Sequence, residues 1–394
     1  MNDVPPLAPL PTGSPTVLMI GAGQLARMSV APAQALGVGL RVLATDAGES
    51  AAQVARDLWL GRHDDMDAVL AAATGVDVVT FDHEHVPPPI LAALEERGTP
   101  VRPGPSALAH AQDKITLRKA LADINIPQPA WTVVETPSDV SVFAHQVGWP
   151  VVLKTSRGGY DGRGVWVVDD LTAATQLLAT TPLPAEAAWL VEEFVPFSQE
   201  LAAQVARSPH GQAVAYPVVQ TTQINGICVE VIAPAPNLSD ADAAEAQRLA
   251  LTIAGQFDVT GMLAVELFHA KDGRILVNEL AMRPHNSGHW SIDGAVTSQF
   301  ENHLRAVLDL PLGSPRAVAP YAVMVNVLGG DHPDLYAAFK HVMARDPGLR
   351  VHLYGKEVRP GRKVGHVTVI GDDLGDLLDR ARHAAGYLTG TITE

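Results

Sequence analysis

The sequence predicts a protein that joins an α/β domain to an α+β region, and three patterns carry that prediction. Strand and helix patterns alternate up to about residue 111, which is typical of a doubly wound parallel sheet. From about residue 128 to residue 310, strand patterns follow one another across short turns, as in antiparallel sheets. The last part of the chain predicts a small β-rich domain with a closing helix.

The N-terminal elements alternate regularly. Strands are expected at TVLMIGAG, LRVLATD and DVVTFD, and helices at QLARMSVAPAQALG, MDAVLAAATG and PPPILAALEERG. The proline-rich stretch before them lacks a basic segment followed by an apolar core. We therefore expect residues 1–14 to be a disordered tail, not a signal peptide, and residues 15–111 to form a Rossmann-like domain.

The elements that follow are mostly strands. One helix is expected over residues 112–127 and another after a Ser239 cap. Central strands are expected at VVLKTS, GVWVV, WLVEEFV, ELAAQVARS, AVAYPVVQTT, GMLAVELF and RILVNEL. The strand YAVMVNVLG, a basic turn between two strands and the helix DDLGDLLDRARHAAGYL then close the chain. We expect domains over residues 112–312 and 313–394.

Composition narrows the class of function. The formal net charge of -15 disfavours a nucleic-acid-binding protein, because the long-range field repels phosphate backbones. No apolar run approaches the ~20 residues of a membrane helix. The single cysteine, Cys228, fits a reducing cytoplasm, and its apolar neighbours predict a buried structural thiol and not a nucleophile.

The first glycine-rich loop, IGAGQLARM, follows a predicted strand and opens a helix. Gly21, Gly23 and Ala26 match G-x-G-x-x-A, and Asp46 ends the next strand where a ribose-binding acid stands in dinucleotide folds. An NAD-dependent oxidoreductase is one hypothesis. The alternatives are a packing role for the glycines and a substrate phosphate at the helix N-terminus.

The second glycine-rich loop, RGGYDGRGV at residues 157–165, is followed by the strand VWVV. A P-loop or a Rossmann turn needs a helix there, so this loop is expected to be the tip of a hairpin and to act as a flap. A plain turn has little use for Tyr160, Asp161 and Arg163. Lys154 ends the strand before the loop and could reach a phosphate beneath it, although a solvent-facing lysine is the alternative.

A metal site is predicted in GMLAVELFHAKDGRILVNEL. If Asp272 and Gly273 form a two-residue hairpin turn, Glu266 lies directly across from Glu279. Two such carboxylates repel unless one is protonated or a cation lies between them, and oxygen ligands suit Mg²⁺. One solvated glutamate is the alternative. The same register puts Asn278 on the opposite face unless the strand has a bulge.

A dense polar run, RPHNSGHW at residues 283–290, follows the second glutamate. His285 and His289 have helical spacing, but proline, serine and glycine in the run disfavour helical zinc ligation. A binding loop for an anionic substrate fits better, and a simple capping loop is the alternative.

The residues above occur in segments that resemble the ATP-dependent 5-(carboxyamino)imidazole ribonucleotide synthetases of purine biosynthesis, a family of the ATP-grasp superfamily. The segments are, in chain order, GAGQLARM, VVTFDHEHVP, QDKITLRKAL, VVLKTSRGGYDGRGVWVV, VEEFV, GMLAVELF, VNELAMRPHNSGHW and GRKVGH. The resemblance covers residues 16 to 385. It implies a pre-ATP-grasp domain, a two-subdomain ATP-grasp centre, a small C-terminal domain, a cytoplasmic homodimer and a need for Mg²⁺, with Mn²⁺ as a possible substitute.

The implied reaction joins bicarbonate to the exocyclic amine of 5-aminoimidazole ribonucleotide while ATP is cleaved to ADP and phosphate. Bicarbonate is a poor electrophile, so ATP converts it to carboxyphosphate, and the amine attacks that intermediate or the carbon dioxide released from it. A closed site protects the intermediate from water.

The resemblance also implies roles for individual residues. Those implied to bind ATP are Lys114, Lys154, Gly159, Tyr160, Asp161, Gly162, Arg163, Gly164, Glu192, Glu193, Phe194, Val195, Glu200 (ribose), Gln223, Asn278 and Glu279. Those implied to bind ribonucleotide or bicarbonate are Glu84, Tyr160, Asp161, Arg163, Arg283, His285 and Asn286, with the 5′-phosphate held by Lys356, Arg359, Arg362 and Lys363. The implied catalytic residues are Asp161, Arg283, His285 and Asn286, and the implied metal ligands are Glu266 and Glu279.

The chain departs from the family pattern at a few positions. Gln223 replaces a usual histidine, Met282 replaces a usual proline, and the segment around Glu84 differs from its common form. The alternatives are another ATP-grasp purine ligase, such as a formate-dependent ribonucleotide transformylase, an NAD-dependent oxidoreductase and a non-catalytic nucleotide-binding regulator. RPHNSGH and the basic C-terminal turn favour the carboxylating ligase.

Overall fold

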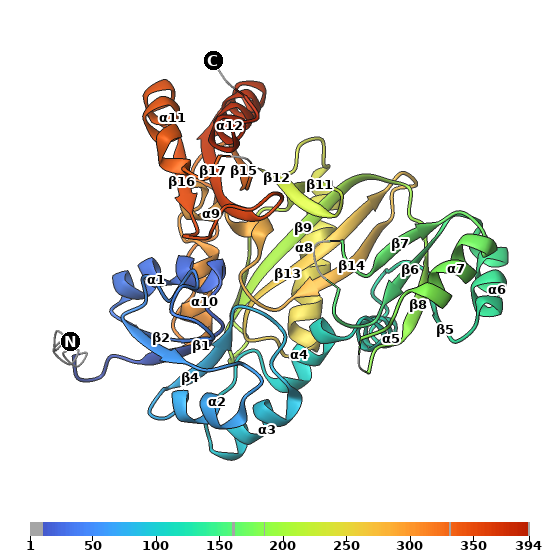
Figure 1. Cartoon of the computed structure of the whole chain (residues 1–394), viewed down its shortest axis with the longest axis horizontal. Helices are drawn as coiled ribbons and strands as arrows, with labels where there is room; N and C mark the ends of the chain where they lie inside the picture. Colours follow the sequence, from blue (N-terminus) through green and yellow to red (C-terminus); the bar gives the residue numbers. More distant parts are fainter. Residues whose placement is uncertain (1–10, 160–161, 185, 331, 393–394) are drawn as a thin grey trace.

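The computed structural model describes residues 11–159, 162–184, 186–330 and 332–392 (Figure 1). Tyr160 and Asp161, and most of the expected N-terminal tail, lie outside the described residues. The strands are β1 Thr16–Ile20, β2 Gly39–Ala44, β3 Asp57–Leu60, β4 Val78–Phe81, β5 Trp131–Val134, β6 Val151–Thr155, β7 Val165–Val168, β8 Trp189–Glu193, β9 Phe197–Arg207, β10 Ala213–Ala215, β11 Val219–Ile224, β12 Ile227–Ala233, β13 Gly261–Ala270, β14 Ile275–Ala281, β15 Tyr321–Leu328, β16 Arg350–Leu353 and β17 Lys363–Gly371.

Helices cover the sheets and connect their strands. They are α1 Gln24–Leu36, α2 Met66–Ala72, α3 Pro88–Glu96, α4 Pro105–Gln112, α5 Lys114–Asp123, α6 Pro137–Val147, α7 Leu171–Thr180, α8 Asp240–Gln256, α9 Ser291–Gly294, α10 Gln299–Val307, α11 Phe339–Arg345 and α12 Leu374–Thr389, with short 3₁₀ turns η1 Asn286–Gly288 and η2 Leu335–Ala338.

The N-terminal region is the expected doubly wound unit. Its parallel strands lie in the order β3-β2-β1-β4. Every predicted strand and helix of this region is present, but β3 and α4 were not expected. The helix expected over residues 112–127 is present as α5, but it is shorter and begins at Lys114, because Asp113 has an extended backbone and caps the helix by accepting the N–H of Thr116 at 2.9 Å.

The rest of the described chain forms two further sheets. The smaller has the order β5-β8-β6-β7, and the larger runs β14-β13-β9-β11-β12-β15-β17-β16 with β10 beside β9. Strand β15 pairs with β12, so the strands expected in a separate C-terminal domain continue the central sheet. The domain boundaries at 112 and 313 stay predictions. The mixed α/β architecture itself agrees with the expected fold.

The β13–β14 hairpin corrects the expected turn and confirms the expected pairing. Ala270 and Arg274 bond to each other at 2.8 Å across a three-residue turn, and Gly273 takes the left-handed conformation there with φ +87°. The two-residue turn was therefore wrong by one residue. The register then shifts between Glu266 and Leu267, which leaves Asn278 as a bulge and brings Glu266 opposite Glu279.

The fold also bears on three further expectations. Cys228 is buried, as expected. Among the described residues, none of the helices has the length and apolar character needed to cross a membrane. The Ser239 cap is also present, since its hydroxyl accepts the N–H of Asp242.

Candidate active site

The centre of the candidate site is the pair Glu266 and Glu279, which lie side by side on β13 and β14. Glu279 accepts a hydrogen bond from Lys114 at 2.9 Å, and Glu266 lies 3.2 Å from Nε2 of His285. Lys114 lowers the pKa of Glu279, whereas burial and the charge of Glu279 raise the pKa of Glu266. This asymmetry is what two close carboxylates show when no cation lies between them.

The two carboxylates suit a divalent cation. Among the described residues, no group of three or more His, Cys, Asp or Glu side chains could hold a metal. The pair therefore offers two oxygen ligands and leaves the other coordination positions to phosphates and water, which is how Mg²⁺ is commonly held.

Two lysines approach the same place from different elements. Lys114 is the first residue of α5, and Lys154 on β6 donates to Oδ1 of Asn278 at 3.1 Å. The bulge turns Asn278 and Glu279 toward these ammonium groups. Lys154 also pairs with Glu192 at 2.8 Å. Burial lowers the pKa of Lys154 and the Glu192 charge opposes that shift, while Glu279 raises the pKa of Lys114.

The second glycine loop joins β6 to β7 as a hairpin, as expected. Its glycines are required by close approaches. A Cβ on Gly159 would lie 2.7 Å from the carbonyl oxygen of Arg163, and a Cβ on Gly164 would lie 2.5 Å from Oγ1 of Thr155. A Cβ on Gly162 would lie 2.8 Å from the Cα of Gly226, so the loop reaches the β11–β12 turn across the cleft.

The end of β8 holds the residues expected to contact adenine. Glu192 is engaged by Lys154, and Glu193 accepts from Arg274 at 3.1 Å. Phe194 is exposed and Val195 is buried. Both carboxylates thus have partners within the protein, and the Phe194 side chain and the backbone are left to face a ligand.

Glu200 and Gln223 lie further along the larger sheet. Glu200 on β9 pairs with Phe268, and burial raises the pKa of its carboxyl to about 7. Gln223 is half-buried on β11, next to an irregularity in its pairing with β12. Their roles toward ribose and nucleotide stay predictions.

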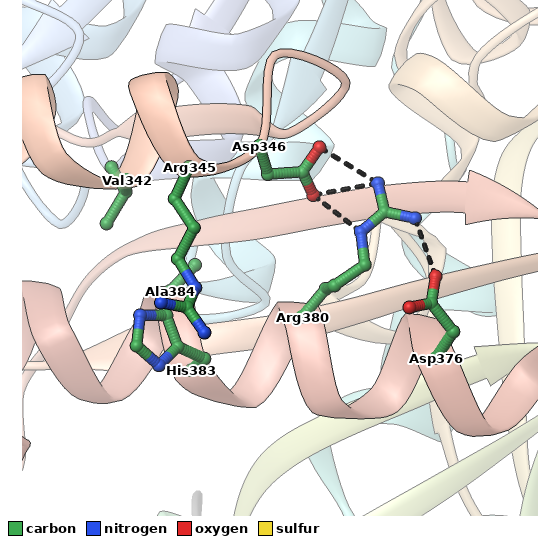
Figure 2. Close-up of a pocket in the computed structure, with 7 residues that line it drawn as sticks. All are labelled: Val342, Arg345, Asp346, Asp376, Arg380, His383 and Ala384. Atoms are coloured by element: carbon green, nitrogen blue, oxygen red, sulfur yellow. Dashed lines mark hydrogen bonds and ion pairs between the residues drawn. The ribbon is translucent and has the colours of Figure 1, made fainter.

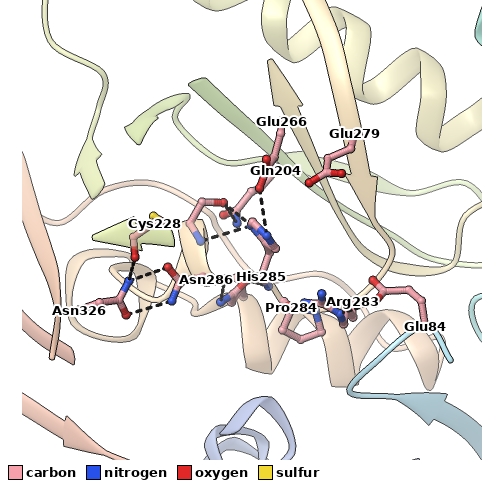
Figure 3. A network of polar contacts seen from close by, with 12 residues as sticks. Glu84, Gln204, Cys228, Glu266, Glu279, Arg283, Pro284, His285, Asn286 and Asn326 are labelled. Atoms are coloured by element: carbon pink, nitrogen blue, oxygen red, sulfur yellow. Dashed lines mark hydrogen bonds and ion pairs between the residues drawn. The ribbon is translucent and has the colours of Figure 1, made fainter. Parts of the chain in front are cut away.

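The loop after β14 presents Arg283 and His285 on the other side of the glutamate pair (Figure 3). Arg283 donates to Glu84 at 2.8 Å, and Oε1 of Glu84 is buried without a hydrogen-bond partner in the described part of the chain. His285 bonds Oγ of Ser287 through Nδ1 at 2.8 Å. Burial, with the charges of Arg283 and Lys363, lowers the pKa of His285 to about 3, so its imidazole is neutral near pH 7.

Asn286 lies beneath this loop. Its amide bonds the amide of Asn326 in both directions, at 3.1 and 2.8 Å, and Asn326 also donates to the carbonyl of Cys228 at 2.9 Å (Figure 3). Both polar atoms of the Asn286 side chain are therefore used within the protein. This pair of hydrogen bonds fixes the loop, and the role of Asn286 toward substrate stays a prediction.

Three buried amides that hold the loop were not predicted. Besides Asn326, Gln204 donates to Ser287 at 3.1 Å, and Gln299 bonds both the N–H and the carbonyl of His285, at 2.9 and 2.8 Å. A single polar residue within an apolar strand, as in ELAAQVA and VMVNVL, was the available signal for two of them.

The first glycine loop packs against Asp82, and its Ala22 and Gly23 also line a pocket. A Cβ on Gly21 would overlap the carboxylate of Asp82, and Oδ2 of Asp82 accepts the N–H of Gly23. Because a buried carboxylate occupies the position that a cradled phosphate would take, the dinucleotide hypothesis loses its main support. Asp46 in turn bonds the N–H of Gly48 at 2.6 Å.

A pocket of about 560 Å³ separates this loop from the basic C-terminal turn. Lys356, Arg359 and Arg362 line it, and Lys356 donates to Gln24 at 2.7 Å. Lys363, expected in the same clamp, is not among the described lining residues, and its charge acts on His285 instead. Three of the four expected cations therefore share one pocket.

A second pocket, of about 360 Å³, lies between α11 and α12 (Figure 2). Arg380 joins Asp346 and Asp376 across its floor, at 2.8 and 2.9 Å. None of its lining residues belongs to the predicted site. Its ion pairs hold the end of α11 against α12, so we interpret the pocket as a result of the packing of these two helices.

Known proteins resemble the chain along almost its whole length. The N5-carboxyaminoimidazole ribonucleotide synthase of Mycobacterium bovis is 53% identical over 379 residues, which cover 95% of this chain and 88% of that protein. The synthase of Corynebacterium ammoniagenes is 44% identical over 98% of this chain and 94% of its own length. The chain belongs to this family. The ribonucleotide synthetase preATP-grasp domain matches residues 15–112, the ATP-grasp domain 119–300 and the phosphoribosylaminoimidazole carboxylase C-terminal domain 322–380.

Solved structures of the family share the fold. The Aspergillus clavatus synthase in complex with ADP and 5-aminoimidazole ribonucleotide has 31% identity and a TM-score of 0.86, over 96% of this chain and 99% of that one. An ADP complex of another synthetase has 33% identity and a TM-score of 0.86, over 94% and 97%. The predicted fold and ligase class are confirmed, and the oxidoreductase and transformylase alternatives are set aside.

Proposed function

We propose that the chain carboxylates 5-aminoimidazole ribonucleotide with bicarbonate and releases ADP and phosphate, through carboxyphosphate. Family membership supports this reaction, and one observation in the structure carries it. The paired Glu266 and Glu279 lie between two lysines on one side and the Arg283–His285 loop on the other. A metal–triphosphate group and a small anion could thus meet at the carboxylate pair.

Lys114 and Lys154 are proposed to bind the ATP phosphates, and Glu266 and Glu279 to hold Mg²⁺. When bound, the cation would neutralise charge on the transferred phosphoryl group. The lysines add positive charge from the opposite side. Because Lys114 already pairs with Glu279 at 2.9 Å, binding of a cation by Glu279 frees this ammonium group for phosphate.

The adenosine is proposed to lie against the end of β8. Since the Glu192 and Glu193 carboxylates have protein partners, the adenine contacts fall to the backbone and to Phe194. Glu200 would accept the ribose hydroxyls, and Gln223 would donate where the family usually has histidine. Gly159, Gly162 and Gly164 let the flap backbone approach the phosphates.

Bicarbonate is proposed to bind between Arg283 and His285. A neutral His285 can donate from Nε2 without adding a second full charge beside Arg283, and Lys363 acts on the same region. The unpaired oxygen of Glu84 can accept from the ribonucleotide. Asp161 stays the proposed acceptor of the amine proton, with Tyr160 and Arg163 as flap contacts.

The 5′-phosphate of the ribonucleotide is proposed to occupy the pocket lined by Lys356, Arg359 and Arg362. A homodimer is also proposed, on the family resemblance.

Release of ADP under omission of each substrate tests this function. With ATP and Mg²⁺ present, we expect ADP only when both bicarbonate and the ribonucleotide are added, and no ADP when formate replaces bicarbonate. ADP release that is independent of the ribonucleotide would contradict the proposal.

A further inference from the structure

Arg118 is a buried charge at the edge of the nucleotide cleft, and none of the roles above includes it. Its side chain is 1% exposed. It stands one helical turn after Lys114 on α5, and it contacts both the edge strand β14 and β8 of the smaller sheet. Burial of a guanidinium costs free energy unless its N–H groups are hydrogen-bonded, so the partners of Arg118 indicate its role.

Those partners lie on both sides of the cleft. Arg118 donates to Oε1 of Glu192 at 2.7 Å, and to the carbonyl oxygens of Val277 and Asn278 at 2.9 Å each. Glu192 belongs to β8 of the smaller sheet, whereas Val277 and Asn278 belong to β14 of the larger one.

The two carbonyls flank the bulge. Pairing of β14 with β13 runs from Leu267–Val277 directly to Glu266–Glu279, so Asn278 is the extra residue. Strand β14 ends the larger sheet, and its outer carbonyls need partners from outside the sheet. Arg118 donates to two of these carbonyls, that of Val277 before the bulge and that of the bulged residue Asn278 itself.

The contacts close a ring. Arg118 bonds Glu192, the other Glu192 oxygen takes Lys154 at 2.8 Å, Lys154 bonds the Asn278 side chain at 3.1 Å, and Arg118 bonds the Asn278 carbonyl. Burial opposes ionisation of Glu192, but Arg118 and Lys154 outweigh it and lower its pKa to about 2. The ring therefore ties the phosphate-binding lysine to the metal-binding strand.

We propose that Arg118 is the positioning residue of the metal–nucleotide site: it fixes the Asn278 bulge and so sets Asn278 and Glu279 against the two lysines. It touches no substrate. The inference rests on the proposed function for the identity of the ligands, but its geometry does not depend on that identity.

Arg118→Met tests this proposal, with Arg41→Met as the matched control. Arg41 makes the same kind of contacts, to the Asp57 carboxylate at 2.8 Å and to the carbonyls of Ala72 and Thr74 at 2.7 and 2.9 Å, but in the N-terminal sheet. Binding of Mn²⁺ and ADP is measured by titration calorimetry on the whole chain. We expect the affinity to fall about 10–100-fold in Arg118→Met, and to be unchanged in Arg41→Met.

Arg118→Lys keeps the test decisive if the methionine variant does not fold. One ammonium cannot satisfy a carboxylate and two carbonyls in this geometry, so we expect a loss of about tenfold in the same titration, with the KM for the ribonucleotide unchanged. Unaltered Mn²⁺–ADP affinity in a folded Arg118 variant, or an equal loss in Arg41→Met, would overturn the proposal. The proposed function has a separate test. If the wild-type chain released ADP without the ribonucleotide, the proposed function would be refuted, whereas the Mn²⁺–ADP titration would be unaffected.

Discussion

The two ends of the candidate site are built in opposite ways. At the ATP end, the side chains of Lys154 and Glu192 are 8% and 2% exposed and belong to a closed ring of charges. At the proposed ribonucleotide end, Arg359 and Glu357 are 66% and 68% exposed and pair with each other within one turn. Exposed pairs of this kind contribute about 0–1 kcal/mol, whereas a broken buried pair costs several.

The difference teaches where folding and binding are coupled. Charges at the ATP end are part of the folded core, so a substitution there should reduce stability and catalysis together. Arg359 at the ribonucleotide end is exposed and lies outside the core, so its substitution should reduce binding alone. The predictions below test this separation, from the largest effect to the smallest.

Glu279→Gln should have the largest effect. The amide removes the negative charge of a proposed metal ligand and weakens its contact with Lys114, so we expect kcat for ADP formation to fall on the order of 10³-fold. Glu245→Gln, which breaks an exposed pair with Arg248, is the control. A loss smaller than tenfold would remove Glu279 from the metal site.

Lys154→Met should lower both the stability of the fold and the affinity for ATP. Glu192 would stay buried with Arg118 as its remaining charged partner, so we expect the free energy of unfolding to fall by about 3 kcal/mol. Urea denaturation measures this, and the KM for ATP should rise in the same variant. Unchanged stability would show that the ring at the ATP end does not support the fold.

Arg359→Met should give the reverse pattern. Loss of one charge-assisted hydrogen bond to a phosphate raises the KM for the ribonucleotide about 10–100-fold. Stability should stay within about 0.5 kcal/mol of wild type, because the residue is exposed. A larger rise in the KM for ATP than in that for the ribonucleotide would contradict the assignment of this pocket.

Glu200 should make stability depend on pH. Burial raises its pKa from 4.5 to about 7, so the folded chain retains a proton that the unfolded chain releases in this interval. The contribution of Glu200 to the free energy of unfolding should therefore decline as pH rises from about 4.5 to 7 and then level off. Glu200→Gln should reduce that decline in urea denaturation of the nucleotide-free protein at pH 5 and 8. Identical declines in the two proteins would show that Glu200 is not desolvated.

Strand patterns and turn residues predicted most of the fold. The Glu266–Glu279 pair shows that such patterns can predict a pairing without predicting the turn correctly. Glu266 was placed opposite Glu279 from a two-residue turn, but the turn has three residues, and the bulge at Asn278 cancels the difference. The pairing was right because the apolar pattern fixes which faces are buried. A bulge was the condition for Asn278 to share the face of Glu279, but its presence could not be predicted, because the proposed support, Arg118, is 160 residues away from Asn278.

The residues that hold the site were less predictable than those that form it. Arg118 is an ordinary position in a helical pattern until its partners, 74 residues or more away, are known. Lys363 was grouped with Lys356 on the family resemblance, but Lys363 begins β17 and is not among the described residues that line the pocket. Local sequence gives the type of side chain, whereas tertiary packing decides which others it meets.

A crystal structure of the chain with ADP, Mg²⁺ and 5-aminoimidazole ribonucleotide tests the central claim most directly. We expect the metal between Glu266 and Glu279, and the ribonucleotide phosphate within hydrogen-bonding distance of Lys356, Arg359 or Arg362. Both phosphate groups at the lysine end, or a ribonucleotide phosphate bound away from the 560 Å³ pocket, would contradict the separation of the two ends.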